Sequence, residues 1–361
     1  MAPRPSRKRG ARLVRAVTDR LWQRDRLQMR AVDALLTAVA PSSGPAPGPG
    51  RRRRTGAPGW DGFRSVLCAV DFSPHSGRAL RYAAAIARRG RAVLTVVHVH
   101  DPLLVAAAAA ALHDRELVTR SGRELQAFIH ATIAPGANPR LRVTRLVSVG
   151  HPPDQILEAA ATSHADLVVL GTRGATGANR LFLGSTTLSV LQRATVPVLA
   201  IPPGARGAAA RPTRSWPGPR IVAALELDRR AGHDVDDAAR IAAWFGASLQ
   251  LVHVVDDVAA PAWLRADLSA HDRRRLAAAR RRIDVLAARS RRQVATDTRV
   301  VSGRVADGIA AVAAEAPAGL LMTALRDRRG WFGAKRGSVS YHVLSQAVMP
   351  VLACPPQWRP R

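Results

Sequence analysis

Residues 165–203, ADLVVLGTRGATGANRLFLGSTTLSVLQRATVPVLAIPP, hold the signals that decide the fold. The stretch begins with ADLVVLG and ends with VPVLAIPP, two short runs that are almost continuously apolar. Such runs are typical of strands buried on both faces of a parallel sheet. A glycine-rich loop and the helical run LSVLQRA lie between them. Strand, loop, helix and strand in this order are the unit from which doubly wound α/β folds are built.

The same alternation continues from this stretch toward the N-terminus. Three more apolar runs, SVLCAV, AVLTVVHV and LRVTRLVSV, predict strands, and the Ala-rich stretches between them predict helices. One of these helices is expected to be long, over residues 105–133. The pattern therefore predicts a Rossmann-like α/β domain whose parallel sheet is covered by helices on both faces.

The whole pattern then occurs a second time. His98 of the second strand aligns with His253 at an offset of 155 residues, and Pro197 of the last strand aligns with Pro350 at an offset of 153. A nearly constant offset along the full length indicates a duplicated domain. We therefore expect two tandem doubly wound domains. The chain divides into a basic extension with its Pro/Gly/Arg linker at 1–60, a first domain at 61–203, a linker at 204–218 and a second domain at 219–361.

The composition excludes several classes of protein. Of the 361 residues, 47% are apolar and 22% are charged, so the chain can bury hydrophobic cores and is not disordered overall. The two cysteines, Cys68 and Cys354, exclude a disulfide framework and offer no metal-ligand spacing. No apolar run reaches the roughly 18 residues of a membrane span, and no signal-peptide core follows the basic N-terminus. We therefore expect a soluble, cytoplasmic protein.

The charge is strongly basic, with 55 Lys and Arg against 26 Asp and Glu and a net charge of +29. All the basic residues except Lys8 and Lys335 are arginines, a bias that a GC-rich coding sequence would give without any nucleic-acid surface. Residues 1–60 are the most basic part, and apolar residues recur there at helical spacing over 11–40. We interpret this part as a flexible basic extension. The alternative is a surface that binds nucleic acid or an acidic membrane.

The glycine-rich loop carries the clearest chemical signal. Gly171, Gly174 and the pair Gly184–Ser185 form the pattern G-x2-G-x9-G-S. Glycines after a parallel strand let backbone N–H groups approach a ligand closely. Ser185 and Thr186 come where the next helix begins, so their hydroxyls and the first amides of that helix can bind an anion. The loop is neither a Walker motif nor the dinucleotide-binding fingerprint.

Asp71 is a second candidate, because it follows the first strand in AVDFSPHS. A carboxylate at this point can accept hydrogen bonds from ribose hydroxyls or from an adenine amino group. The alternative is that Asp71 caps the following helix. Because the glycine loop lies at the same edge of the predicted sheet, we favour a nucleotide site.

The remaining histidines and cysteines of the strands have a simpler interpretation. His98 and His253 lie on apolar strands and are predicted to be packed, hydrogen-bonded histidines. Cys68 and Cys354 lie on predicted core strands, where a free thiol behaves as a small hydrophobic side chain. No order of Ser, His and Asp and no pair of carboxylates indicates hydrolytic catalysis.

Together, Asp71 and the glycine motif resemble the universal stress protein family. The resemblance covers both repeats, about three-quarters of the chain, and G-x2-G-x9-G-S is the signature of the ATP-binding branch of that family. It implies small α/β domains that pair as dimers and bind ATP, with Mg²⁺ on the phosphates, without a catalytic base. The residues that it implies against the nucleoside are Ala69, Asp71 and Val99, and those along the ribose and phosphates are Leu170, Gly171, Arg173, Gly174, Gly184, Ser185 and Thr186.

The second repeat departs from this pattern. Glu226 aligns with Asp71, Ala324 with Gly171, and Asp327 with Gly174, whereas Gly337 and Ser338 are retained. Asp327 places a negative charge where the resemblance would put a polyphosphate, and two such charges about 4 Å apart repel by up to about 4 kcal/mol. We therefore predict that repeat two has lost ATP or binds a different anion.

The predicted function is that of an ATP-binding regulatory or stress-response protein. One alternative is a slow ATPase or phosphotransferase. The missing Gly-Lys-Ser/Thr motif and the lack of an evident catalytic base argue against it. The other is a polyanion-binding module that uses the basic extension.

The final strands of the two repeats predict how the domains assemble. Both strands are apolar and end in Pro-Pro, as edge strands do, and an exposed apolar edge invites aggregation. We predict that residues 196–201 and 349–354 pair antiparallel within one chain and form an intrachain pseudo-dimer. The alternative is a homodimer in which each domain finds its counterpart on another chain.

Overall fold

The computed structural model describes residues 60–111, 117–133, 141–173, 183–204, 216–256, 269–315, 318–325 and 339–359. The helix predicted over 11–40 lies outside these residues, as do Gly174 of the predicted site and Asp327, Gly337 and Ser338 of repeat two. The helix predicted over 105–133 corresponds to two described helices on either side of 112–116.

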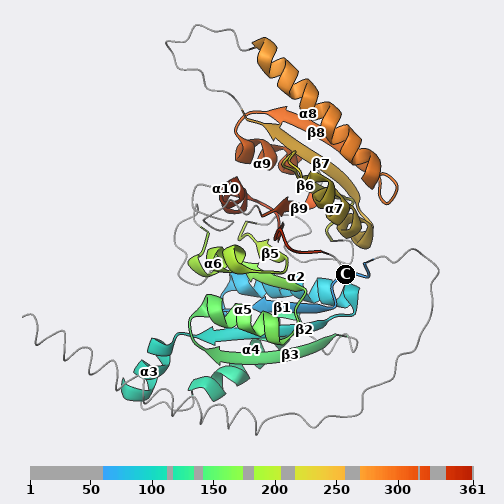
Figure 1. Cartoon of the computed structure of the whole chain (residues 1–361). Coiled ribbons are helices and arrows are strands. Elements are labelled where there is room, and N and C mark those ends of the chain that lie inside the picture. The colour runs from blue at the N-terminus through green and yellow to red at the C-terminus, as the bar shows by residue number, and fades with distance from the viewer. Residues whose placement is uncertain are drawn as a thin grey trace, which may run out of the picture. The chain divides into compact units, whose positions relative to one another are not determined.

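Repeat one alternates strands and helices as the sequence predicts (Figure 1). Its elements are β1 (Ser65–Ala69), α2 (Pro74–Gly90), β2 (Val93–His100), α3 (Pro102–Ala111), α4 (Leu117–Ile133), β3 (Arg142–Val149), α5 (Pro152–Thr162), β4 (Leu167–Gly171), α6 (Ser185–Arg193) and β5 (Val198–Ile201).

Repeat two has the same order of strands, each separated from the next by a helix. Its elements are β6 (Arg220–Ala224), α7 (Ala231–Phe245), β7 (Ser248–Val255), α8 (Ser269–Ser290), β8 (Thr296–Ser302), α9 (Val305–Glu315), β9 (Ala318–Ala324), α10 (Val339–Gln346) and β10 (Val351–Cys354). None of the described helices is long and apolar enough to cross a membrane.

The described strands form one ten-stranded sheet with the order β3-β2-β1-β4-β5-β10-β9-β6-β7-β8. Within each repeat the neighbouring strands run parallel. The two halves join where β10 pairs antiparallel with β5, with Leu352 opposite Leu199. The prediction that the two final strands pair within one chain is therefore confirmed.

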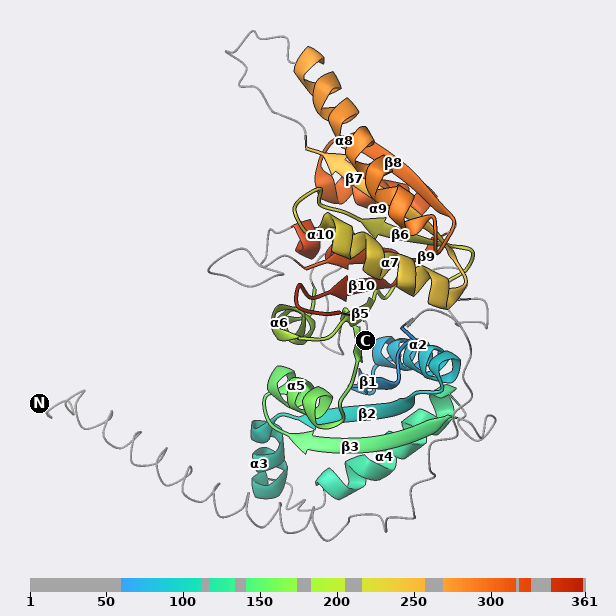
Figure 2. The same ribbon diagram turned by 45° about the vertical axis from the view of Figure 1, so that its right-hand side comes forward.

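Helices cover both faces of this sheet, because successive strand residues point to opposite sides. On one face, α2, α4, α7 and α8 contribute to one buried apolar cluster. On the other face, α5, α6, α9 and α10 contribute to a second cluster (Figures 1 and 2). The predicted fold class, two tandem doubly wound α/β domains, is thereby confirmed.

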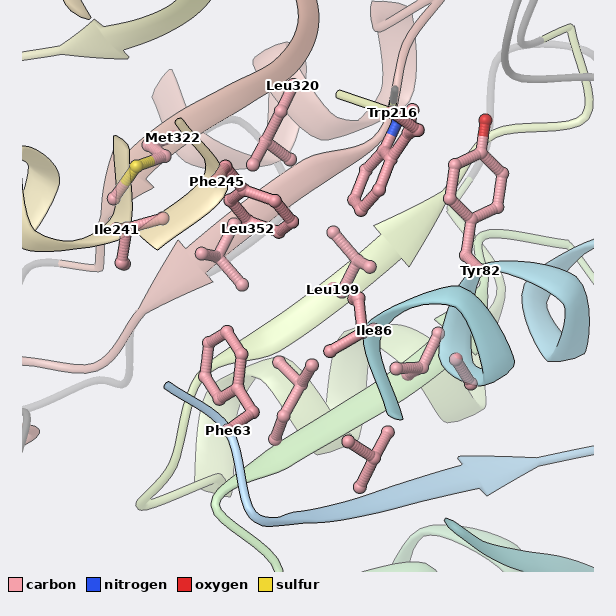
Figure 3. Packing of buried hydrophobic residues seen from close by; sticks show 14 of the residues in the cluster. Phe63, Tyr82, Ile86, Leu199, Trp216, Ile241, Phe245, Leu320, Met322 and Leu352 are labelled. Carbon is pink, nitrogen blue, oxygen red and sulfur yellow. The ribbon is translucent and has the colours of Figure 1, made fainter. Parts of the chain in front are cut away.

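The two repeats share both clusters, so they do not have separate cores. At the junction, Tyr82 of α2 packs edge-to-face on Trp216 with ring centroids 4.9 Å apart, and Trp216 packs on Phe245 of α7 at 5.3 Å (Figure 3). Arg89 of α2 donates two hydrogen bonds, of 3.0 and 2.8 Å, to the carbonyl oxygen of Trp244. Repeat two thus completes the hydrophobic core of repeat one.

Candidate functional site

The predicted site residues come from three neighbouring strands of repeat one. β1 lies between β2 and β4, and all three run in the same direction. Their carboxyl ends therefore meet at one edge of the sheet, where α/β folds bind ligands. Ala69 ends β1, Leu170 and Gly171 end β4, and Val99 lies two residues beyond Val97, the last partner of β1 on β2.

Asp71 lies in a tight turn between β1 and α2. Its Oδ1 accepts a hydrogen bond of 3.0 Å from the N–H of Ser73, and its own N–H donates to Oγ of Ser76 at 3.3 Å. Between these residues, Phe72 has a φ of +61°, in the left-handed region. The turn fixes the Asp71 carboxylate at the end of the strand.

The cap of α2 is Ser73 rather than Asp71. The Oγ of Ser73 accepts a hydrogen bond of 3.2 Å from the N–H of Ser76, three residues on, as an N-cap side chain does. The alternative interpretation of Asp71 as the helix cap is therefore wrong. Asp71 instead bonds the backbone two residues on, which is the turn that Asp side chains favour.

The described ends of the glycine loop are held together by hydrogen bonds. The N–H of Gly184 donates to the carbonyl oxygen of Thr172 at 2.8 Å, and the hydroxyl of Thr187 donates to the carbonyl oxygen of Gly171 at 2.8 Å. The N–H of Thr172 donates in turn to Ile201 of β5 at 2.9 Å. These bonds place the amino end of α6 directly behind the carboxyl end of β4.

At two glycines of the motif, the backbone of a neighbouring residue lies close to the position that a Cβ atom would occupy. A Cβ on Gly171 would lie 3.2 Å from the carbonyl oxygen of Arg173, and a Cβ on Gly184 would lie 3.3 Å from that of Thr172. Such contacts are tight, so the close packing of strand end and helix start is one physical reason for both glycines. Ala324, the counterpart of Gly171 in repeat two, shows that a methyl group is accommodated where this motif is degenerate.

The amino end of α6 has the features of an anion site. Gly184 is the N-cap and provides no side chain to cap the first amides of the helix. Those amides carry the positive end of the helix dipole and have no partner within the helix. Ser185 and Thr186 occupy the first turn, and Arg173 lies two residues beyond the end of β4. This is the chemistry that binds phosphate groups.

Two buried histidines, His98 and His100, lie on the last three residues of β2. Nδ1 of His98 donates to the carbonyl oxygen of Val70 at 2.9 Å, because a carbonyl can only accept. Nε2 of His100 lies 2.8 Å from Oγ of Ser121, which itself donates to Leu117. His100 must therefore be the donor to Ser121. Burial lowers the pKa of both imidazoles, which favours their neutral forms.

The bond of His98 occurs again in repeat two. Nδ1 of His253 lies 2.9 Å from the carbonyl oxygen of Leu225, at the equivalent place on β7 and β6. The same bond occurs in both repeats, although the glycine motif of repeat two is degenerate. In each repeat it links the second strand to the residue that follows the first strand. The prediction that both histidines are packed and hydrogen-bonded is confirmed.

Repeat two contains a small cavity that the sequence analysis did not predict. About 20 Å³ of space, enough for one water molecule, lies at the carboxyl ends of β6, β9 and β10 beside α7. Its lining includes Asp237 and Cys354, whose counterparts in repeat one are the fully buried Tyr82 and Ile201. Burial raises the pKa of Asp237 to about 6, against the opposing effect of Arg240, which lies 3.3 Å away. These apolar-to-polar changes between aligned positions are the signal that could have revealed it.

Comparisons with known proteins agree with this architecture. The model of the Universal stress protein family matches the chain twice, over residues 62–202 and 219–355. The "Universal stress protein in QAH/OAS sulfhydrylase 3'region" of Thermus aquaticus is 34% identical over 139 residues, which are 38% of this chain and 98% of that protein.

One solved structure shows the same fold, and another member of the family has been solved with a ligand. A universal stress protein from Archaeoglobus fulgidus is 18% identical, covers 81% of this chain and 98% of its own, and has a TM-score of 0.58. A universal stress protein solved in complex with cAMP is 28% identical over 39% of this chain and 97% of its own, with a TM-score of 0.29. Because the family model matches most of the sequence in two consecutive segments, the chain belongs to the universal stress protein family, with two copies of the domain in tandem.

Proposed function

We propose that the protein is a nucleotide-binding universal stress protein that holds one ATP per chain at the carboxyl edge of repeat one. The observation that carries this proposal is the closure of Gly184 onto Thr172 and of Thr187 onto Gly171. It sets the uncapped amino end of α6 at the end of a parallel strand, beside the turn that holds Asp71. Phosphate groups bind at such helix ends in α/β folds.

The residues of the site fit the parts of ATP. The amides and hydroxyls of Ser185 and Thr186, with the guanidinium of Arg173, supply donors for the phosphates. Asp71 supplies a carboxylate for ribose hydroxyls. In this proposal Ala69, Val99, Leu170 and the glycines Gly171, Gly174 and Gly184 line the nucleotide, and Mg²⁺ accompanies the phosphates.

The role that this site supports is regulatory. The imidazoles of His98 and His100 bond to Val70 and Ser121, and burial favours their neutral forms, so their described bonds are structural. We propose a cytoplasmic stress-response protein that signals by holding nucleotide, rather than an ATPase. Release of inorganic phosphate from bound ATP within minutes would contradict that part of the proposal.

The same proposal covers domain organisation and assembly. We divide the chain into domains at 61–203 and 219–361, which contain the two segments matched by the family model. β10 already covers the edge of β5 within the chain, so we expect a monomer that has the two-fold arrangement of a dimer. Light scattering at low protein concentration tests this, and a homodimer would contradict it.

Titration calorimetry with Mg-ATP tests the assignment of the site. Asp71→Ala removes one or two hydrogen bonds to the nucleotide, each worth about 1 kcal/mol net, so the dissociation constant should rise by about five- to thirtyfold. The matched control is Glu226→Ala, at the aligned and exposed position of repeat two, and it should leave ATP binding unchanged. Asp71→Asn keeps an acceptor for the N–H of Ser73 and separates loss of the turn from loss of the nucleotide contact.

Two results would overturn the assignment. One is an equal loss of affinity in Asp71→Ala and Glu226→Ala, since the site would then not belong to repeat one. The other concerns cAMP, which a solved member of the family holds. We expect ATP to bind more tightly than cAMP, because only a polyphosphate chain extends to the amino end of α6, and the reverse order would exclude ATP as the preferred ligand.

A further inference from the structure

Helix α8 of repeat two is far more basic than its counterpart α4 in repeat one. α8 contains seven arginines and two aspartates, whereas α4 contains two arginines and one glutamate. The two helices are equivalent, since Ile283 and Ile129 are both buried, and their offset of 154 residues lies between the offsets of 155 and 153 found before and after them. A compositional bias of the coding sequence acts on both repeats alike, so it does not explain the difference.

The two acidic residues of α8 are already engaged within the protein. Asp284 accepts a hydrogen bond of 2.7 Å from the hydroxyl of Thr298 on β8, and Asp272 pairs with Arg275 at 3.4 Å. Of the other arginines, Arg289 pairs with Asp236 at 2.8 Å and Arg282 donates to the carbonyl oxygen of Asp228 at 3.1 Å. These bonds tie the flanks of α8 to the domain.

Four further arginines are exposed and have no recorded partner within the described part of the chain. Arg274, Arg280 and Arg281 lie on α8, and Arg292 lies in the turn that follows it. At 100° per residue, Arg274 and Arg281 are opposite the buried Ile283, and they are about 10 Å apart along the helix axis. Arg280 lies on the flank of the helix, three residues before Ile283. We call these four residues the α8 arginine face. It lies on the outermost helix of repeat two and on the turn that follows this helix (Figure 1).

The chemistry of this face selects one kind of partner. Arginine binds phosphate with two parallel hydrogen bonds, and α8 is about 33 Å long, close to one turn of a nucleic-acid duplex. α8 contains no Trp, Tyr or Phe, so it offers no platform on which unpaired bases could stack. Its apolar side, with Ile283 and Ala287, is buried in the core and is not available for insertion into a membrane.

We propose that the α8 arginine face binds the phosphate backbone of a nucleic-acid duplex without reading its sequence. The proposal is independent of ATP binding, because α8 belongs to the other repeat from the nucleotide site. It is also distinct from any binding by residues 1–60, because substitution of the α8 arginines leaves the charge of residues 1–60 unchanged.

The test uses the full chain and a fluorescently labelled duplex of 20 base pairs. Its affinity is measured by anisotropy between 50 and 200 mM NaCl. The test variant carries Arg274→Gln, Arg280→Gln, Arg281→Gln and Arg292→Gln. The control removes the same charge at four exposed arginines of repeat one, by Arg91→Gln, Arg123→Gln, Arg142→Gln and Arg145→Gln. The first three have no partner among the described residues, and Arg145 bonds only the side chain of Gln126.

Each phosphate contact contributes about 0.9 to the slope of log affinity against log salt. Loss of four contacts should make the slope shallower by about 3 to 4 in the test variant. The control should change it by less than 1, because exposed charges more than about 10 Å from the duplex are screened at these salt concentrations. The substitutions lie on the surface, so melting temperatures of all three proteins should agree within a few degrees.

Three outcomes would overturn the proposal. Equal losses in the test and control variants would show that only net charge matters. An unchanged slope in the test variant would assign duplex binding to other parts of the chain. In a parallel assay with phosphatidylserine vesicles, a loss of vesicle binding in the test variant together with intact duplex binding would identify the face as a membrane contact instead.

Discussion

Leu352→Ala tests the conclusion that the two repeats share their buried clusters and do not have separate cores. Leu352 is 2% exposed and lies on β10, opposite Leu199 of β5 and beside Met322 of β9. All three belong to the apolar cluster that extends through both repeats (Figure 3). Truncation of a buried leucine to alanine typically costs 2–5 kcal/mol, because the apolar contact is lost and a cavity remains. We expect the free energy of unfolding to fall by about that amount.

Urea denaturation, followed by tryptophan fluorescence and by far-UV circular dichroism, measures this change. The midpoint should move to lower urea at an unchanged slope, and the two signals should still coincide in one transition. The control is Val285→Ala on α8, where the side chain is 71% exposed and the expected change is within about 0.5 kcal/mol. A loss below 1 kcal/mol at Leu352, or two separate transitions of which only one moves, would refute the shared core.

Substitution by alanine should have opposite effects at two helical glycines. Gly90→Ala should destabilise the protein, because the new Cβ would lie 2.2 Å from the carbonyl oxygen of Phe63. Gly122→Ala should stabilise α4 by about 0.5–1 kcal/mol, because no atom lies within 4 Å of the new Cβ. Melting temperatures that change in the same direction would contradict this. Asp237 has a pKa of about 6 in the folded protein, above its ordinary value of 3.8, so the folded state holds that proton more tightly than the unfolded chain. Its contribution to stability should therefore fall as the pH rises from about 4 to about 6, and Asp237→Asn should remove this fall in unfolding free energies measured at pH 4.5 and 7. An equally steep fall in the variant would exclude Asp237 as its source.

The sequence patterns sufficed for the order of elements, because each strand and helix has its own local signature. The alternation of apolar strands with Ala-rich helices, the duplication, and the pairing of residues 196–201 with 349–354 all follow from such patterns, and the sheet order confirms them. The position of the helix cap did not follow. Asp71 and Ser73 are both good N-cap residues, and only the backbone turn at Phe72 decides between them.

Contacts between residues far apart in the sequence were not predictable in the same way. The ten-stranded sheet brings α2 and α7 to the same face, and this is why Tyr82, Trp216 and Phe245 pack together at the junction. No local sequence pattern predicts this packing. The cavity beside Asp237 arises likewise from smaller and more polar side chains on separate elements of repeat two. The candidate nucleotide site could be predicted from the sequence only in part. Its glycines and Asp71 are visible as a motif, whereas the bonds that close Gly184 onto Thr172 required the fold.

We propose that one repeat holds the nucleotide while the other completes its hydrophobic core. Calorimetric titration of the full chain with Mg-ATP tests it most directly, through the number of sites per chain. Gly174→Asp, which copies the residue that repeat two has at this position, serves as the non-binding reference, since it adds a negative charge beside the phosphates. We predict one site per chain, and we predict that this site is absent in Gly174→Asp. Two equivalent sites, or one site that survives Gly174→Asp, would contradict it.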